Sequence, residues 1–181
     1  MDIMHDRAGF YICWGFLAWV PRVCTSTTLY LVQHPIHLGT AVTSLLLILG
    51  ASATLINYLA DGQRQKVRAT QGICTVWGKQ PLLTKASYST SRGEIKESIL
   101  FASGWWGIAR HFHCLPEILG ALCWSLPGLF SNFLPYFYVA FLAALLIDPF
   151  VRDDKRCKEK YGSNWDLHCQ KVRYKILPYV W

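Results

Sequence analysis

Long apolar stretches alternate with polar or basic segments along this 181-residue chain. Residues 8–33, 38–60, 97–126 and 132–148 are mainly hydrophobic, and residues 38–60 contain no charged side chain. A membrane helix needs about 20 apolar residues to cross a hydrocarbon core about 30 Å thick. The pattern therefore predicts an all-α fold, a polytopic transmembrane helical bundle with a cytosolic C-terminal helical tail.

Two of these stretches contain residues that shape a helix. Pro21 interrupts the first, so we expect a kinked span there, with Arg22 turned toward the protein interior. Small residues along the second favour close packing against another helix. They are Gly39, Ala41, Gly50, Ala51 and Ala53.

Basic residues fall mainly in two blocks, within residues 61–96 and 150–175. Two hydrophobic passes separate the blocks, which returns the chain to the same side of a membrane. Cytosolic segments of membrane proteins carry an excess of Lys and Arg. We therefore predict a cytosolic loop at 61–96 and a cytosolic tail at 150–181. Within the loop, the alternation over residues 86–90 predicts a short strand or an extended hairpin.

Composition supports a membrane protein and argues against nucleic-acid binding. Hydrophobic residues make up 52% of the chain and charged residues only 16%, below the quarter that is typical for charged residues. The net charge of +7 lies largely in the two blocks that membrane topology explains. The seven cysteines form no CxxC pair, so neither a zinc site nor a disulfide framework is indicated.

Sequence motifs limit the kinds of cofactor site. His5 lies between Asp2 and Asp6, but without a further nearby ligand a solvated edge is favoured over a metal site. The chain contains neither GxGxxG nor GxxxxGK[ST], nor GxSxG. A nucleotide site of the Rossmann or P-loop type is therefore not indicated, and phosphate groups would be bound by side chains.

Three clusters of ionisable residues are predicted to meet on the cytosolic face. Arg64 and Arg68 lie four residues apart on one helical face, where guanidinium groups bind phosphate well. An ordinary positive membrane flank is an equal alternative. The second cluster lies within residues 104–117, where Trp106 and Arg110 accompany two histidines in a mainly apolar run. A polar site is favoured there over an interfacial aromatic belt.

The third cluster lies in the tail. The spacing of four of its residues predicts that they share one helical face: Asp153, Cys157, Tyr161 and His168. A basic stripe runs beside them: Arg152, Arg156 and Lys160. A helix lying on anionic lipid is the alternative, but the polar face favours a docked helix that closes a site.

These residues together resemble the C-terminal part of the sterol reductase family of the endoplasmic reticulum, the group that includes sterol C14 reductase and the lamin B receptor. The resemblance covers residues 1–181 and rests on several segments: MDIMHDRAGFY, LYLVQHP, the Arg64/Arg68 pair, GWWGIARHFH, LPYFY, RDDKRCKEKYGSNW and ILPY. The insertion GICTVWGKQP and the wording ARHFH look most like the Δ7 branch, that of 7-dehydrocholesterol reduction.

The resemblance implies the C-terminal half of a multi-pass reductase domain in the endoplasmic reticulum membrane. It implies NADPH-dependent reduction of a sterol ring double bond, the Δ7 bond of 7-dehydrocholesterol-type sterols, by alkene protonation and then hydride transfer. Sterol, membrane lipid and other sterol-biosynthesis membrane proteins are the implied partners, with no nucleic acid. A non-catalytic sterol-binding or scaffold protein, or an inactive fragment, is the alternative.

The resemblance also implies site residues. Carried over position by position, and with Arg110 added from the second cluster, the NADPH contacts are Arg64, Arg68, Phe101, Trp106, Arg110, His113, Cys114, Asp153, Cys157, Lys158, Glu159, Lys160, Tyr161 and His168. Three residues are candidates for the proton donor: Asp153, Tyr161 and His111.

Overall fold

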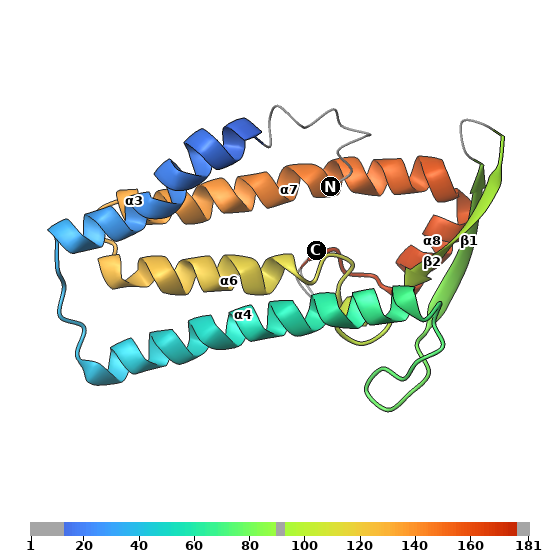
Figure 1. Cartoon of the computed structure of the whole chain (residues 1–181), viewed down its shortest axis with the longest axis horizontal. Helices are drawn as coiled ribbons and strands as arrows, with labels where there is room; N and C mark the ends of the chain where they lie inside the picture. Colours follow the sequence, from blue (N-terminus) through green and yellow to red (C-terminus); the bar gives the residue numbers. More distant parts are fainter. Residues whose placement is uncertain (1–12, 90–92, 177–181) are drawn as a thin grey trace.

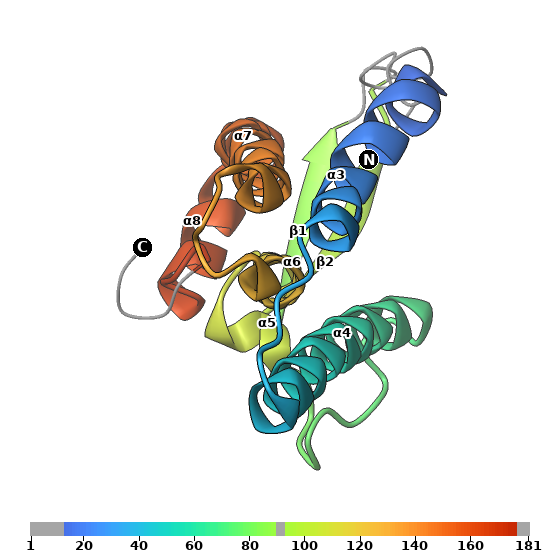
Figure 2. The same cartoon turned by 90° about the vertical axis from the view of Figure 1, so that its left-hand side faces the viewer.

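Four helices form an elongated bundle in the computed structural model, which describes residues 13–89 and 93–176. They are α3 (Val20–Gln33), α4 (Thr40–Ala69), α6 (Cys114–Ser125) and α7 (Leu134–Tyr161). Helix α6 lies between α4 and α7, while α3 packs along α7 (Figure 1). Viewed along the bundle, α3 lies apart from α4, on the other side of α6 (Figure 2).

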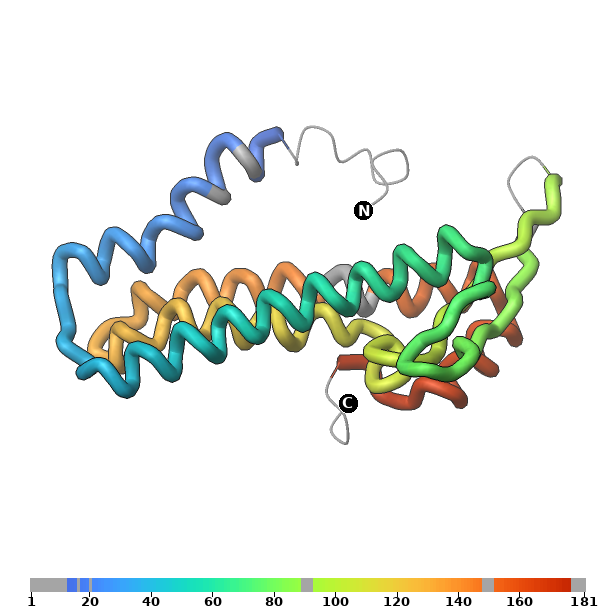
Figure 3. Tube along the Cα trace, turned by 60° about the horizontal axis from the view of Figure 1, so that its bottom comes forward, coloured from blue at the N-terminus to red at the C-terminus, as the bar shows by residue number. Residues whose placement is uncertain are grey.

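Smaller elements gather at one end of this bundle (Figure 3). Strands β1 (Leu83–Ser89) and β2 (Ile95–Phe101) pair antiparallel, with Leu83 opposite Phe101. The short helices α5 (Trp105–Ile108) and α8 (Ser163–Lys171) complete this end, where α8 and α7 both contact β1. We call it the polar end, because both basic blocks of the sequence lie there.

Helices α4 and α7 are the two within the described residues that are long and apolar enough to cross a membrane. Only 6% and 7% of the residues in their most apolar stretches are buried in the protein. Leu47 and Ile48 of α4, for example, are 67% and 64% exposed. Contiguous apolar surface of this size is typical of contact with lipid, and not of a soluble core helix.

The first predicted span is interrupted where the sequence indicated, though not as a simple kink. A π-helical turn at Gly15–Trp19 leads directly into α3, and Pro21 occupies the first turn of that helix. Proline has no backbone N–H, so it fits best where that donor has no helical partner. Helix α3 ends at Gln33, as predicted from the turn at residues 34–37. Arg22 is exposed, so the expectation that it faces inward is wrong for the chain as described.

The predicted continuous span at 97–126 is wrong. Its first residues belong to β2, residues 102–113 form α5 and a loop, and only α6 and a 3-10 turn at Leu126–Gly128 enter the bundle as helix. The number of apolar residues in a stretch does not distinguish a strand followed by a loop from a helix. The apolar residues of Ile95–Phe101 are compatible with a strand as well as with a helix. The all-α prediction is corrected accordingly, because a β-hairpin covers the polar end.

The helices that contain the predicted spans at 38–60 and 132–148 continue beyond the predicted ends of those spans. Helix α4 continues nine residues past the predicted end at residue 60, through Arg64 and Arg68, to Ala69. Helix α7 likewise joins the predicted span at 132–148 to the tail and ends at Tyr161. The loop at 61–96 and the tail therefore begin as rigid extensions of membrane-length helices.

Small residues set the packing of α4 against α6. Of the five small residues predicted to do so, Gly50 and Ala53 face α6, whereas Gly39, Ala41 and Ala51 are exposed. A Cβ atom at Gly50 would lie 3.6 Å from the Cys123 side chain, and one at Gly120 would lie 3.9 Å from that of Ala53. Ala53 and Ala60 are buried on the same side of α4. The two helices can therefore approach closely along most of the length of α6.

A larger side chain at Ala60 should loosen this contact. Ala60 is fully buried, so Ala60→Leu is expected to lower the free energy of unfolding by about 1–3 kcal/mol through overpacking. The measurement is thermal unfolding of the detergent-solubilised protein. Ala51→Leu, the same change at an exposed position of α4, is the control and should leave Tm nearly unchanged. Equal effects at both positions would contradict the packing assigned here.

Candidate functional site

Trp106 lies at the centre of the polar end. Its indole Nε1–H donates a hydrogen bond of 2.9 Å to the Ala60 carbonyl of α4. The Arg64 guanidinium carbon lies 4.4 Å from the ring centroid, and the His113 ring lies 5.3 Å away at 31°. A cation over a tryptophan face is attracted by about 0.5–2 kcal/mol. Arg64, Trp106 and His113 therefore form one connected unit, which we call the Arg–Trp–His cluster.

Gly104 allows this cluster to form. Its φ of 62° lies in the left-handed region, and a Cβ atom there would collide with the Gln63 side-chain amide. The same amide accepts a hydrogen bond of 3.1 Å from the Trp105 backbone N–H. The Gly104 backbone can thus approach α4 closely, and the short helix α5 starts against it.

Helix α7 supplies the facing wall of the site. Arg64 interacts electrostatically with Asp153 and Cys157 of α7, as well as with Asp61 on its own helix. His111 also interacts with Asp153, and its ring centroid lies 6.4 Å from that of His113. The structure therefore brings together six of the predicted site residues: Arg64, Trp106, His111, His113, Asp153 and Cys157.

Burial keeps the two histidines of this site neutral. Desolvation lowers the pKa of His111 from 6.5 to about 4, with Asp153 opposing the shift. Desolvation also lowers the pKa of His113, where Asp61 opposes and Arg64 reinforces the shift. At neutral pH both rings are uncharged. The Nδ1 atom of His113 is buried and has no hydrogen-bond partner among the described residues.

Arg110, predicted as a cofactor contact, instead ties the C-terminal segment to the fold. Its Nη1 atom donates to the Val172 carbonyl at 3.0 Å, and its Nη2 atom lies 3.7 Å from Asp154 Oδ1. The other carboxylate oxygen of Asp154 lies 3.4 Å from the Lys175 ammonium group. The Arg110 side chain is only 6% exposed, which suits a positioning role better than direct contact with a ligand.

Tyr161 lies against the hairpin. Its hydroxyl donates to Ser98 Oγ at 3.4 Å, and its ring meets that of Tyr88 edge-on at 5.7 Å. The Lys160 ammonium group lies 3.9 Å from the Tyr88 ring centroid. The strand or hairpin predicted over residues 86–90 is confirmed by the pairing of β1 with β2, and this hairpin covers the end of α7.

His168 does not share a helical face with Asp153, Cys157 and Tyr161, so that prediction is wrong. Gly162, with a φ of 53°, ends α7 and starts α8, which carries His168 in another direction. The ring packs 5.3 Å from Trp165, and burial lowers the pKa of His168 to about 4, with Arg110 and Lys171 adding to the effect. His168 therefore belongs to the packing of α8.

The remaining predicted contacts surround the cluster at different distances from it. Arg68 is exposed one turn beyond Arg64, and Phe101 is half-buried at the end of β2. Cys114 is fully buried and packs with Ile176. Lys158 faces Asp166 of α8 at 3.7 Å on the surface, and Glu159 is exposed.

Three residues of the site were missed by sequence reasoning: Asp61, Gln63 and Asp154. Asp61 and Gln63 lie directly before Arg64 in the sequence, so the helical extension of α4 was the available signal. Asp154 gave no signal in the sequence, because its partners are distant along the chain. Arg110 lies 44 residues before it (154 − 110) and Lys175 lies 21 residues after it (175 − 154). The candidate metal ligands at residues 2, 5 and 6 lie outside the described residues.

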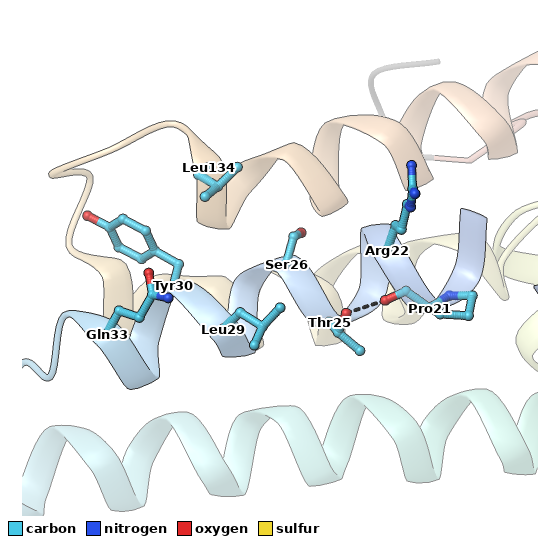
Figure 4. Close-up of a pocket in the computed structure, with 8 residues that line it drawn as sticks. All are labelled: Pro21, Arg22, Thr25, Ser26, Leu29, Tyr30, Gln33 and Leu134. Carbon is cyan, nitrogen blue, oxygen red and sulfur yellow. Dashed lines mark hydrogen bonds between the residues drawn. The ribbon is translucent and has the colours of Figure 1, made fainter. Parts of the chain in front are cut away.

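A separate groove of about 480 Å³ lies between α3 and the start of α7 (Figure 4). It is lined by apolar and polar side chains, among them Arg22, Ser26, Tyr30 and Leu134. The groove is at the end of the bundle opposite the Arg–Trp–His cluster, so it is not part of the candidate site.

The fold and the site define a helical membrane protein with a cationic and aromatic site where its long helices end. The chain belongs to the ergosterol biosynthesis ERG4/ERG24 family, which it matches over residues 1–181. Members of this family are sterol reductases, so the prediction of a sterol reductase relationship is confirmed.

Individual relatives agree with this family. The chain is 56% identical over 181 residues to 7-dehydrocholesterol reductase of Arabidopsis thaliana, covering 100% of this chain and 42% of the relative. It is 38% identical over 180 residues to 7-dehydrocholesterol reductase of Danio rerio, covering 99% and 38%. It is also 38% identical over 181 residues to Delta(14)-sterol reductase TM7SF2 of Mus musculus, covering 100% and 41%. The chain thus spans about two fifths of the length of these relatives.

The buried His168 predicts a pH dependence of stability. Its pKa of about 4 in the folded protein lies below the ordinary value of 6.5. As pH falls from 6.5 toward 4, the unfolded chain binds a proton that the folded chain excludes, so stability is lost, by at most about 3 kcal/mol. His168→Gln should flatten the decline of Tm over this pH range.

The matched control is His37→Gln, at an exposed position between α3 and α4. This variant should keep the pH dependence of the unmodified chain. An unchanged slope in His168→Gln would show that the ring is not excluded from protonation by its surroundings.

Proposed function

We propose that this chain carries the cofactor-binding part of an NADPH-dependent sterol reductase that reduces the Δ7 double bond of 7-dehydrocholesterol-type sterols in the endoplasmic reticulum membrane. The observation that carries the proposal is the 56% identity, over the whole chain, to a protein named 7-dehydrocholesterol reductase. A second relative with this name, from Danio rerio, is 38% identical, the same value as for the Delta(14)-sterol reductase, so the preference for the Δ7 bond rests on the Arabidopsis thaliana relative alone.

The residues of the polar end fit an anionic dinucleotide. Arg64 and Arg68 place two guanidinium groups one helical turn apart on α4, and such groups bind phosphate oxygens in pairs. The unpartnered Nδ1 atom of His113 offers a further polar contact. NADPH, when bound, supplies the hydride for reduction of an alkene.

Trp106 has a different role from the one its flat ring suggested. The side chain is 5% exposed, and Arg64 already covers one face. Trp106 is therefore proposed to hold Arg64 in place for the phosphate groups, instead of stacking on a ring of the cofactor. The hydrogen bond from Trp106 to Ala60 fixes this support to the end of the apolar part of α4.

The residues of the chain also rank the candidate proton donors. His111 is uncharged at neutral pH because burial lowers its pKa to about 4, so it holds no extra proton to give. The Tyr161 hydroxyl donates a hydrogen bond to Ser98 Oγ. Asp153 lies beside Arg156, 3.8 Å away. We therefore place Tyr161 first among the candidates for protonation of the alkene, ahead of Asp153 and His111.

Nucleotide titration tests the cofactor assignment. The purified chain is expected to bind NADPH more tightly than NADH, and Arg68→Ala should reduce this preference by roughly 10–100-fold, the value of one or two hydrogen bonds to a charged group. Arg68 is exposed, so its loss should not disturb folding. Arg64→Ala is less suitable, because it also removes the cation that packs on the Trp106 ring. Arg22→Ala, at the opposite end of the bundle, is the control. Equal binding of both nucleotides by the unmodified chain would refute the assignment.

Sterol profiling tests the reaction. Expression in cells that lack the Δ7 reductase should lower the 7-dehydrocholesterol content measured by mass spectrometry, and Tyr161→Phe should abolish this effect while leaving the amount of chain in the membrane unchanged. Unchanged 7-dehydrocholesterol, with the chain present in the membrane and binding NADPH, would favour a non-catalytic sterol-binding or scaffold role.

A further inference from the structure

The loop at residues 72–80 folds back along α4 in a tight hairpin. Gln71 and Gly72, with φ of 52° and 85°, reverse the chain directly after α4. Val76 and Lys79 then exchange two backbone hydrogen bonds, of 2.8 and 3.1 Å. Trp77 and Gly78 form the turn between them, with φ of 50° and 76°. A positive φ is unusual for a side chain as large as tryptophan, so this turn is held in a conformation that must be stabilised by contacts.

Ring contacts fix the position of the loop tip relative to the membrane helix. The Trp77 ring meets that of Trp105 edge-on, 5.2 Å away. The Trp105 backbone N–H is bound to Gln63 of α4, and the next residue along is bound to Ala60. Trp77 therefore lies level with residues 60–63. This is the place where the uncharged stretch of α4 ends and its charged extension begins at Asp61.

The tip is apolar and open. Trp77 is 60% exposed and Ile73 is 87% exposed, although both lie among polar and basic neighbours. Lys66, Thr70 and Gln80 line a groove of about 530 Å³ together with Ile73. Lys79 closes the turn and is exposed. An aromatic ring flanked by lysines, at the level where a membrane helix becomes polar, is the pattern of side chains that settle at the boundary between lipid headgroups and acyl chains.

We propose that residues 72–80 form an interfacial anchor, in which Trp77 and Ile73 enter the headgroup region of the bilayer while Lys66 and Lys79 face lipid phosphates. The proposal commits to lipid because the exposed Trp77 lies level with the end of the uncharged stretch of α4, and because Lys66 and Lys79 accompany the exposed apolar side chains of the loop. It depends on α4 crossing the membrane and does not depend on the proposed reductase activity. The anchor would hold Arg64 on the aqueous side, just beyond the acyl chains.

Fluorescence quenching in reconstituted bilayers tests this assignment. The chain is placed in phosphatidylcholine vesicles whose acyl chains carry bromine either near the headgroup or near the bilayer centre. Subtracting the signal of Trp77→Phe, which keeps an aromatic ring, from that of the unmodified chain isolates Trp77. We expect the Trp77 signal to lose more intensity with shallow bromines than with deep ones, and to be protected from iodide in water.

Trp165→Phe provides the matched control, since Trp165 is 7% exposed in α8 and its signal should respond to neither bromine position. Two results would overturn the proposal. Quenching of Trp77 by iodide but not by bromine would place the loop in water. Protection from both quenchers would show that protein, either a second copy or another chain, covers the tip.

Discussion

The attachment of Trp106 to α4 is the interaction on which the polar end depends. A single indole N–H reaches the Ala60 carbonyl, at a level where lipid gives way to water and an unpaired polar group would be costly. This contact holds residues 102–113 against α4, and with them the start of α6. Arg64, one turn further on, then rests on the same ring. One side chain thus aligns a helix end, a loop and a cation.

A second group of contacts, between residues far apart in the sequence, holds the C-terminal segment against the loop before α6. The carboxylate of Asp154 lies between Arg110 and Lys175, and the backbone N–H groups of Arg110 and His111 donate to the carbonyls of Tyr174 and Lys175. Backbone hydrogen bonds therefore hold the C-terminal segment against the loop. A charge as buried as that of Arg110 needs such partners.

The sequence predicted the parts of this arrangement that depend on local spacing. The Arg64/Arg68 pair, the small residues of α4 and the end of α3 followed from periodicity and composition. The pass at 97–126 did not, because apolar content alone is the same for a strand followed by a loop as for a helix. His168 was misplaced because Gly162 breaks the tail helix. The role of Arg110 depends on Val172, Asp154 and Lys175, whose proximity only the tertiary structure establishes.

The continuity of α4 and α7 has a mechanical consequence. Each helix runs without a break from the lipid-facing part of the bundle to the polar end, and a helix of 30 residues is about 45 Å long. Arg64 and Asp153 are therefore carried on the ends of two stiff rods, and their separation follows the angle between those rods. Side-chain rotation cannot change that angle, whereas a bilayer of different thickness can, because a membrane helix accommodates a mismatch in length partly by tilting.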